Sequence, residues 1–305
     1  MSAAITSPTV DAGSEAPVVR RRSSRLLRSI RSRRIVMVAL AIIALVVTWA
    51  IAAPLLAPHP PRQGNVVDSK LPPSWLPQGE RKFLLGTDEL GRDVLSRVIY
   101  GAQISLMVGA SAVALAGAMG VSMGLLAGYY GGRLDDTIMR LADIQLALPQ
   151  ILLAIAILAV LGPGIQNVIL TLAITNWVTY ARVVRGQVLS LREREFVQAA
   201  RCIGVGDRSI MFKHILPNTL ASIIVIASFA VASTMLAEAA LSFLGLSVGP
   251  DVPTWGGMVA SGRDQIITGQ WWIYTFPGLA IMLTVLGINT VGDWLRDYLD
   301  PRLRI

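Results

Sequence analysis

The sequence contains very few of the side chains that bind metal ions or form disulfide bonds. Its 305 residues include one cysteine, Cys202, and two histidines, His59 and His214. A single cysteine cannot form an internal disulfide bond, and these three residues are too few for a closed zinc site of Cys and His ligands. Both histidines lie in polar segments between the apolar runs. Neither is therefore placed to act as the base of an intramembrane serine protease.

Charge is scarce as well. Charged residues make up 15% of the chain, whereas hydrophobic residues make up 53%. No G-x-x-x-x-G-K-[ST] run occurs, so the chain itself has no loop that cradles nucleotide phosphates. The net charge of +8 would suggest nucleic acid in a soluble protein. Here the basic residues cluster where they orient membrane helices, and no nucleic-acid partner is expected.

What the sequence does have is long apolar runs. Continuous runs of about 20 residues are typical of helices that cross a membrane, and these runs do not alternate as β-strands would. Six spans are predicted, at about residues 35–57, 101–128, 149–161, 165–180, 219–246 and 272–289. The third and fourth are short and are expected to extend into flanking amphipathic residues. The predicted fold class is an all-α polytopic membrane protein.

The spans divide the chain into five regions. The first is a basic, disordered cytoplasmic tail (1–34) with eight arginines between Arg20 and Arg34, which could also bind anionic lipid. A first transmembrane helix follows, and its length favours a retained anchor over a cleaved signal peptide. The other three regions are an extracytoplasmic loop (58–100), a transmembrane core (101–295) and a cytoplasmic C-terminus (296–305).

The distribution of cations predicts the orientation of the spans. With the N-terminus inside, the inner segments hold 20 of the 27 lysines and arginines, and the long outer loop holds most of the rest. Long loops count little in the positive-inside rule. Both termini are therefore predicted in the cytoplasm, together with residues 195–218.

Two features of the spans have a structural interpretation. Gly120, Gly124 and Gly128 recur every four residues and are expected to let another helix approach closely. Glu238 is the clear ionisable group within a span, which is thin support for a proton-coupled carrier. Such a carboxylate either forms hydrogen bonds to a neighbouring helix or belongs to a substrate path. Arg182 and Arg185, at the end of the fourth span, are expected to reach the inner surface.

The most informative stretch is EFVQAARCIGVGDRSIMFKHILPN, residues 195–218. It interrupts the apolar runs and is too polar for lipid, so it must lie in water or against protein. We expect a short helix, a glycine turn at Gly204 and Gly206, and a second helix over 208–215 with Asp207 as its N-cap. Leu216-Pro217-Asn218 is expected to end that second helix.

The first of these helices has two faces at helical spacing. One face is predicted to contain Glu195, Gln198, Ala199 and Cys202, and the other Phe196, Ala200 and Ile203. Alanines permit close approach to a partner surface, while Phe196 and Ile203 offer apolar anchors. The segment is either a plug for a socket on another protein or an amphipathic helix resting on lipid headgroups, and spacing alone does not separate the two.

Residues 195–218 resemble the EAA loop of bacterial ABC-import permeases. Gln198 stands at the position of that family's glutamate, followed by Ala199 and Ala200, and Gly204 matches its glycine. Three more blocks are similar to the second, C-type permease of dipeptide and oligopeptide importers. They are LLGTDELGRDVLSRVIYGAQISLMVG (84–109), LAEAALSFLGLSVGPDVPTWGGMV (236–259) and DWLRDYLDPRLR (293–304). Gln103 stands where an arginine is expected. The resemblance covers about residues 35–305.

The resemblance implies a type I ABC importer fold with six transmembrane helices and a cytoplasmic coupling loop (190–218). The implied protein is a non-catalytic subunit of the bacterial inner membrane that works with a second permease, two ATP-binding cassette subunits and an extracytoplasmic substrate-binding protein. ATP and Mg²⁺ would be bound by the partner ATPases, with no cofactor in this chain. The residues expected to couple to the ATPase are Glu195, Phe196, Gln198, Ala199, Ala200, Gly204, His214 and Pro217.

The outer loop offers a second candidate site. Asp88, Arg92 and Asp93 are expected either to contact the delivery protein or to cap a short interfacial helix. The function predicted is ATP-driven import of di- or oligopeptides by alternating access. Two alternatives are the same importer class with nickel, haem or another small cargo, and a self-sufficient secondary carrier.

Overall fold

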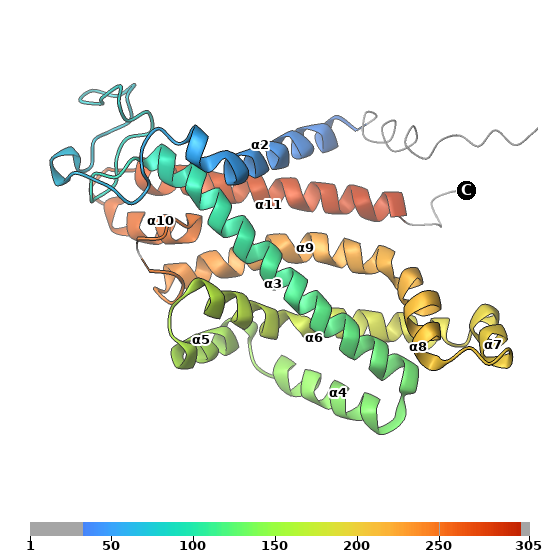
Figure 1. Ribbon diagram of the computed structural model, residues 1–305. Helices are drawn as coiled ribbons and strands as arrows, with labels where there is room; N and C mark the ends of the chain where they lie inside the picture. Colours follow the sequence, from blue (N-terminus) through green and yellow to red (C-terminus); the bar gives the residue numbers. More distant parts are fainter. Residues whose placement is uncertain (1–32, 250, 300–305) are drawn as a thin grey trace, which may run out of the picture.

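The fold is helical throughout the part of the chain that the computed structural model describes, residues 33–249 and 251–299. Apart from the connections, only an isolated β-bridge between Thr87 and Asp93 interrupts this pattern there. Figure 1 shows long helices packed along one another, with the 57–93 connection at one end of the bundle and α7 and α8 at the other. The predicted all-α fold is confirmed. Most of the basic tail and the end of the chain beyond Leu299 lie outside the described residues.

Five helices of 23 to 37 residues form the bundle. They are α2 (Arg34–Leu56), α3 (Val94–Tyr130), α6 (Ile165–Leu191), α9 (Leu216–Phe243) and α11 (Trp272–Leu299). The shorter helices are α4 (Gly132–Leu146), α5 (Gln150–Leu161), α7 (Glu195–Cys202), α8 (Asp207–Ser209) and α10 (Trp255–Gly262). Two short 3₁₀ helices, η1 (Val66–Asp68) and η3 (Arg263–Gln265), and a π-helical turn, η2 (Ile210–Ile215), complete the set.

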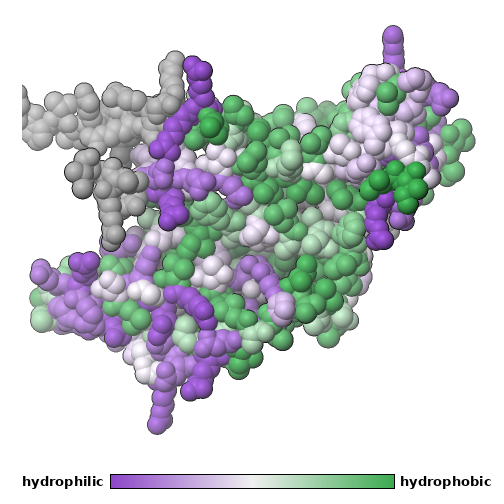
Figure 2. Space-filling model, turned by 180° about the vertical axis from the view of Figure 1, so that it is seen from behind, coloured by the Kyte–Doolittle hydropathy of each residue, from purple (hydrophilic) through white to green (hydrophobic). Residues whose placement is uncertain are grey.

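Not all six predicted spans qualify by length and hydropathy. Four helices of the described chain do: α2, α3, α11 and the continuous helix Asp207–Phe243, which joins α8, η2 and α9. The pair α4 and α5 makes a fifth if it is counted as one span bent by 92°. The helix α6 is long, but polar residues such as Asn176, Arg182 and Arg185 interrupt it. Figure 2 shows the resulting hydrophobic band across the molecule, with hydrophilic residues gathered at both ends.

The helix α3 begins earlier than the sequence predicted. It starts at Val94, within the predicted outer loop, because the Asp93 carboxylate caps it. The backbone N–H of Ser96 donates to Asp93 Oδ2 at 3.0 Å, and the Ser96 hydroxyl donates to the same oxygen at 2.5 Å. A helix of 37 residues is about 55 Å long. It therefore exceeds the roughly 30 Å hydrocarbon core and extends beyond it.

The predicted close approach at the α3 glycines is confirmed, and the partner helix is α6. A Cβ atom added at Gly120 would clash with the carbonyl oxygen of Trp177, and one at Gly124 with that of Ala181. At Gly128 the added Cβ would lie 2.8 Å from Val188 Cβ. With backbone against backbone over three turns, α3 and α6 form one tightly packed pair.

Ion pairs fix α4 against α6. Arg185 Nε and Nη2 donate to the two carboxylate oxygens of Asp135 at 2.5 and 2.6 Å, and Arg182 pairs with Asp143. These two arginines were expected to reach the inner surface, and that expectation stays a prediction. In the structure they hold the amphipathic helix α4 beside α6, and the bidentate pair fixes its orientation.

The two ends of the described chain lie at the same end of the bundle. Arg33 Nη1, just before α2, is 2.7 Å from Asp297 Oδ2 near the end of α11. Both residues are largely exposed, so the pair contributes little stability. Its position nevertheless shows that α2 begins where α11 ends, and Figure 1 places α7 and α8 at that end of the molecule too.

Candidate functional site

The candidate site is the stretch from α7 to η2, residues 195–215, hereafter the α7–α8 segment. It projects beyond the end of the long helices, at the lower right of Figure 1. Glu195 lies in the first turn of α7 and Arg201 in its last turn, which suits the dipole of a short helix. The segment therefore folds as a helical hairpin outside the apolar band.

The glycine turn predicted between the two helices is present. Gly204 has φ +79°, a left-handed conformation that ends α7. Its N–H donates to the Arg201 carbonyl at 2.9 Å, and the Val205 N–H donates to the Ala200 carbonyl at 3.0 Å. Nothing lies within 4 Å of a Cβ added at Gly204, so backbone conformation, and not space, selects glycine here.

One face of α7 is buried against the bundle, and it is not the face expected. Val197 is fully buried and Ala200 is 6% exposed. They join a cluster with residues of α3, α6 and η2: Leu125, Tyr129, Val184, Val188, Ile210, Met211 and Ile215. The prediction that Ala200 faces a partner is wrong, because its side chain packs on this chain's own core. Val197, three residues before Ala200, was the missed signal.

The opposite face of α7 is open. Phe196 is 43% exposed and Ile203 is 80% exposed, and Glu195, Gln198 and Ala199 are exposed beside them. The Gln198 amide donates only a 3.3 Å hydrogen bond to the Arg192 carbonyl. This surface combines apolar and polar groups on a segment held rigidly from behind. It can therefore dock against another protein.

The second half of the α7–α8 segment, formed by α8 and η2, differs from the prediction in two ways. Gly206, and not Asp207, is the N-cap of α8, and the Asp207 carboxylate accepts a hydrogen bond from the Tyr129 hydroxyl at 2.6 Å. The chain also does not stop at Leu216-Pro217-Asn218. It passes through the π-helical turn η2 directly into α9, with Pro217 in the first turn of that helix.

The π-helical turn explains how Pro217 is accommodated. Proline lacks an N–H and its ring clashes with the carbonyl one turn before it, so an ordinary α-turn would break here. A wider turn relieves that clash. The Asn218 side chain donates to the His214 carbonyl at 2.6 Å, which satisfies one carbonyl of the turn. His214 itself is half-buried, and Pro217 is exposed.

The outer-loop candidates are buried. Asp88 accepts hydrogen bonds from the backbone of Leu90 and Arg92 at 2.9 Å and pairs with Arg92 Nε at 2.7 Å. Arg97 Nε lies 3.5 Å from the same carboxylate. Together with the Asp93 cap, this network organises the loop before α3. The three side chains are thus not exposed for a delivery protein to contact directly, and Asp93 caps the long helix α3 instead of the short interfacial helix that was expected.

Glu238 is also a structural group. It is 2% exposed, and its Oε1 accepts hydrogen bonds from the hydroxyls of Ser242 at 2.7 Å and Ser247 at 3.1 Å. These partners lie on its own helix and in the following connection, and Thr254, the N-cap of the neighbouring helix α10, is a third hydrogen-bond partner. The carboxylate therefore fixes how the chain leaves α9.

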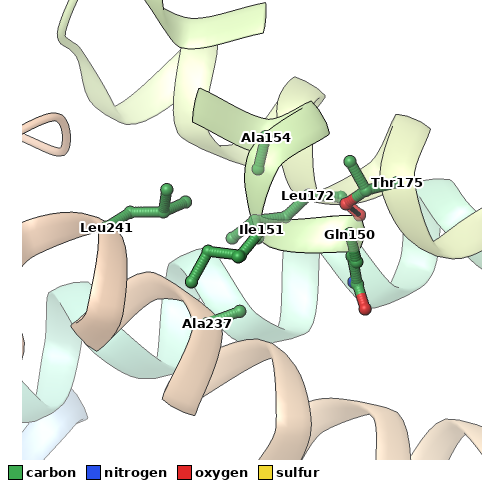
Figure 3. Close-up of a pocket in the computed structure, with 7 residues that line it drawn as sticks. All are labelled: Gln150, Ile151, Ala154, Leu172, Thr175, Ala237 and Leu241. Carbon is green, nitrogen blue, oxygen red and sulfur yellow. Dashed lines mark hydrogen bonds between the residues drawn. The ribbon is translucent and has the colours of Figure 1, made fainter. Parts of the chain in front are cut away.

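A cavity of about 230 Å³ opens between α5, α6 and α9. Figure 3 shows its lining residues, which are Gln150, Ile151, Ala154, Leu172, Thr175, Ala237 and Leu241. Its walls are mainly aliphatic, and the Gln150 amide donates to Asn176 Oδ1 at 3.1 Å. No sequence pattern predicts this cavity, because its residues come from three separate segments of the chain. In the described part of the chain no three His, Cys, Asp or Glu side chains are grouped to hold a metal ion.

Known proteins are similar over most of the chain. Residues 120–305 match the family described as binding-protein-dependent transport system inner membrane component, and residues 23–73 match the N-terminal TM domain of oligopeptide transport permease C. The di/tripeptide transport system permease protein DppC of Pseudomonas aeruginosa is 48% identical over 260 residues, covering 85% of this chain and 86% of that protein. The oligopeptide transport system permease protein OppC of Bacillus subtilis is 39% identical, over 90% and 88% of the two chains.

A solved structure shares the fold. A chain of the MetNI methionine ABC transporter, in inward-facing conformations, superposes with a TM-score of 0.52 at 19% identity. The match covers 67% of this chain and 96% of that one. At this identity the likeness concerns the arrangement of helices alone.

Proposed function

Because this chain belongs to the binding-protein-dependent transport system inner membrane component family, we propose that it is the C-type permease subunit of an ATP-driven importer of di- or oligopeptides. It is a multi-pass membrane subunit of a transport system, and it forms one half of the translocation pathway. The peptide cargo is supported by the names of its relatives. Nickel, haem and other small cargoes are variants within the same importer class.

The observation that carries the mechanism is the shape of the α7–α8 segment. One face of α7 is anchored in the chain's own core, while Phe196 and Ile203 are exposed on the other. That geometry suits a part that receives force from a partner and passes it to the bundle. The partners are two ATPase subunits, which bind ATP and Mg²⁺. A second permease and an extracytoplasmic delivery protein complete the importer.

The orientation follows from charge and from the ends of the chain. The positive-inside rule favours a cytoplasmic location for the end of the bundle that carries the α7–α8 segment. Arg33 and Asp297 pair at that same end, which supports two cytoplasmic termini in the bacterial inner membrane. The Asp88–Arg92–Asp93 network then belongs to the extracytoplasmic side. A delivery protein would meet the exposed groups around that network, such as Trp75 and Leu90.

The test removes the exposed aromatic anchor of α7. Phe196→Ala should weaken co-purification of the ATPase subunits and lower peptide uptake by about tenfold, since a buried aromatic anchor at an interface contributes about 2 kcal/mol or more. The measurement is ATP-driven uptake of labelled peptide by the complete importer in proteoliposomes, with subunit stoichiometry on the same samples.

The matched control is Phe243→Ala. Phe243 is 44% exposed, as Phe196 is, but lies at the opposite end of the bundle at the end of α9. It should leave ATPase binding unchanged. Equal effects of the two substitutions on ATPase binding would contradict the docking role of α7.

A further inference from the structure

One side chain of α3 contacts both limbs of the α7–α8 segment. The Tyr129 hydroxyl, one residue before the end of α3, donates to Asp207 Oδ1 at 2.6 Å across 78 positions of sequence. The Arg201 guanidinium, at the end of α7, lies 5.3 Å from the centre of the Tyr129 ring. Tyr129 is therefore held by α8 on one side and by α7 on the other.

These contacts are directional, unlike the apolar packing around them. A hydrogen bond to a carboxylate at this distance is of the short, charge-assisted kind, and it weakens steeply when its angle changes. The Tyr129 side chain is 6% exposed, and its hydroxyl lies at the edge of the packed region, where it meets the exposed Asp207. The apolar contacts of Val197 and Ala200 would tolerate sliding of α7, whereas the Tyr129–Asp207 hydrogen bond fixes the position of α8 against α3.

The α7–α8 segment has further attachments to the bundle, at each of its two ends. Its second limb continues without a break into α9, so any movement reaches α9 through the backbone. Before α7, residues 192–194 join it to the end of α6, and Arg192 Nη1 donates to the Gly128 carbonyl of α3 at 3.1 Å. The helix α3 is in turn packed backbone to backbone on α6.

We propose that the Tyr129–Asp207 hydrogen bond, supported by Arg201, is a latch that makes α3 and α6 move with α9 when the α7–α8 segment is displaced. This inference rests on the proposed function, since it concerns how that segment transmits force. Without the latch, displacement would still reach α9 and α6 through the backbone and α3 through the apolar cluster, but α8 would no longer be held at a fixed angle to α3. Tyr129 is thus a positioning residue for transport.

The test uses the complete importer in proteoliposomes and compares Tyr129→Phe with the unchanged chain. This substitution keeps the ring, its packing and the Arg201 guanidinium over its face, and removes the hydroxyl with its hydrogen bonds to Asp207 and Arg201. Peptide accumulated per ATP hydrolysed should fall by about tenfold, the ratio that corresponds to a charged hydrogen bond of ordinary strength. ATP hydrolysis and subunit assembly should stay near normal. Asp207→Asn keeps an oxygen acceptor at Oδ1. It should therefore accumulate more peptide per ATP hydrolysed than Asp207→Ala does.

Tyr130→Phe is the matched control. Tyr130 is 51% exposed and touches the Tyr129 ring edge to face, but it is not the residue that donates to Asp207. It should leave the transport ratio unchanged. An unchanged ratio in Tyr129→Phe would overturn the latch. If the complex with the unchanged chain hydrolyses ATP but transports no peptide, the proposal that the cargo is a peptide is wrong. The latch is then tested by the distance measurement below, which does not depend on the cargo.

A distance measurement tests the latch without reference to cargo. Cys202 is exposed and is the one cysteine of the sequence, so a spin label there reports on α7. A second label is placed by Leu126→Cys on α3, and the other subunits are used as variants from which the cysteines have been removed. The latch predicts that the distance between the labels changes little on ATP binding in the unchanged chain and broadens or shifts in Tyr129→Phe. Identical distance distributions in the two proteins in both states would reject it.

Discussion

At the scale of single residues, burial distinguishes the predicted site residues that are exposed for contact with a partner from those that stabilise this chain's own fold. Phe196 and Ile203 are exposed on α7, whereas Ala200, from the same predicted face, packs inward. Asp88 and Asp93 are buried and form their hydrogen bonds within the chain, through both oxygens of Asp88 and through Oδ2 of Asp93. A charged residue type alone therefore does not identify a contact surface in this protein.

Glu238 gives a prediction at this scale. Both serine hydroxyls donate to the same oxygen, Oε1, and the amide oxygen of glutamine can accept both hydrogen bonds. Glu238→Gln should therefore leave ATP-driven peptide uptake within about twofold of normal. Glu238→Leu leaves the hydroxyls of Ser242 and Ser247 without this acceptor and should lower the stability of the chain by about 1–3 kcal/mol.

The measurements are uptake by the reconstituted importer and the unfolding temperature in detergent. A self-sufficient carrier driven by protons would behave in the opposite way. It would lose uptake with Glu238→Gln and would transport without its ATPase partners. Loss of uptake in Glu238→Gln with a normal unfolding temperature would show that the carboxylate proton matters.

At the scale of elements, the helix pair α3 and α6 is the rigid part of the molecule. Three glycines of α3 meet backbone and Cβ atoms of α6, and ion pairs join α4 to the other side of α6. Polar residues of α6 are used in these contacts. This is why a helix with modest hydropathy can still lie within the bundle.

Gly124→Ala tests that packing. The added Cβ would clash with the Ala181 carbonyl, which is backbone and cannot rotate away. The substitution should destabilise the chain by about 1–3 kcal/mol, as overpacking of an interior does. Thermal unfolding of the purified importer, followed by the loss of monodisperse complex, measures the effect.

Gly117→Ala is the control on the same helix. Its added Cβ would meet the Tyr180 ring at 3.7 Å, which is ordinary contact. Because alanine is the better helix former, this variant should be as stable as the natural chain or slightly more so. Equal destabilisation by the two substitutions would mean that α3 and α6 are not in close contact in the membrane.

The sequence predicted the elements better than their junctions. The apolar runs predicted the long helices and Gly204 predicted the turn after α7, because both features depend on local sequence patterns. The start of α3 was missed because Asp93 acts as a cap only once the loop before it is folded. The π-helical turn was missed because Pro217 is a stop signal in sequence, and the continuation into α9 depends on tertiary packing of Ile210, Met211 and Ile215. The inward turn of Ala200 has the same cause.

At the scale of the whole molecule, the apolar band separates two differently built ends. One end is a loop network organised by Asp88 and Asp93, and the other carries the α7–α8 segment and both ends of the described chain. The prediction that follows concerns which end faces the cytoplasm. Cys202 reports on it directly, because it is exposed on α7 and is the one cysteine in the sequence.

In membranes stripped of peripheral proteins, a membrane-impermeant maleimide should label Cys202 in inverted vesicles and not in right-side-out vesicles. The control combines Cys202→Ser with Asp264→Cys, which places the thiol at an exposed position in the connection between α10 and α11. That variant should show the reverse pattern. Labelling of Cys202 from outside would invert the proposed topology.

The continuous passage from α8 through η2 into α9 has a mechanical consequence. Figure 1 shows this helical path turning a corner near the start of α9, and no break in hydrogen-bonded helix relieves that corner. A rigid helical path with a bend transmits force from one part to the other. A force applied to α8 parallel to the membrane would therefore tilt or rotate α9. The corner near the start of α9 would thus set the direction of any such motion.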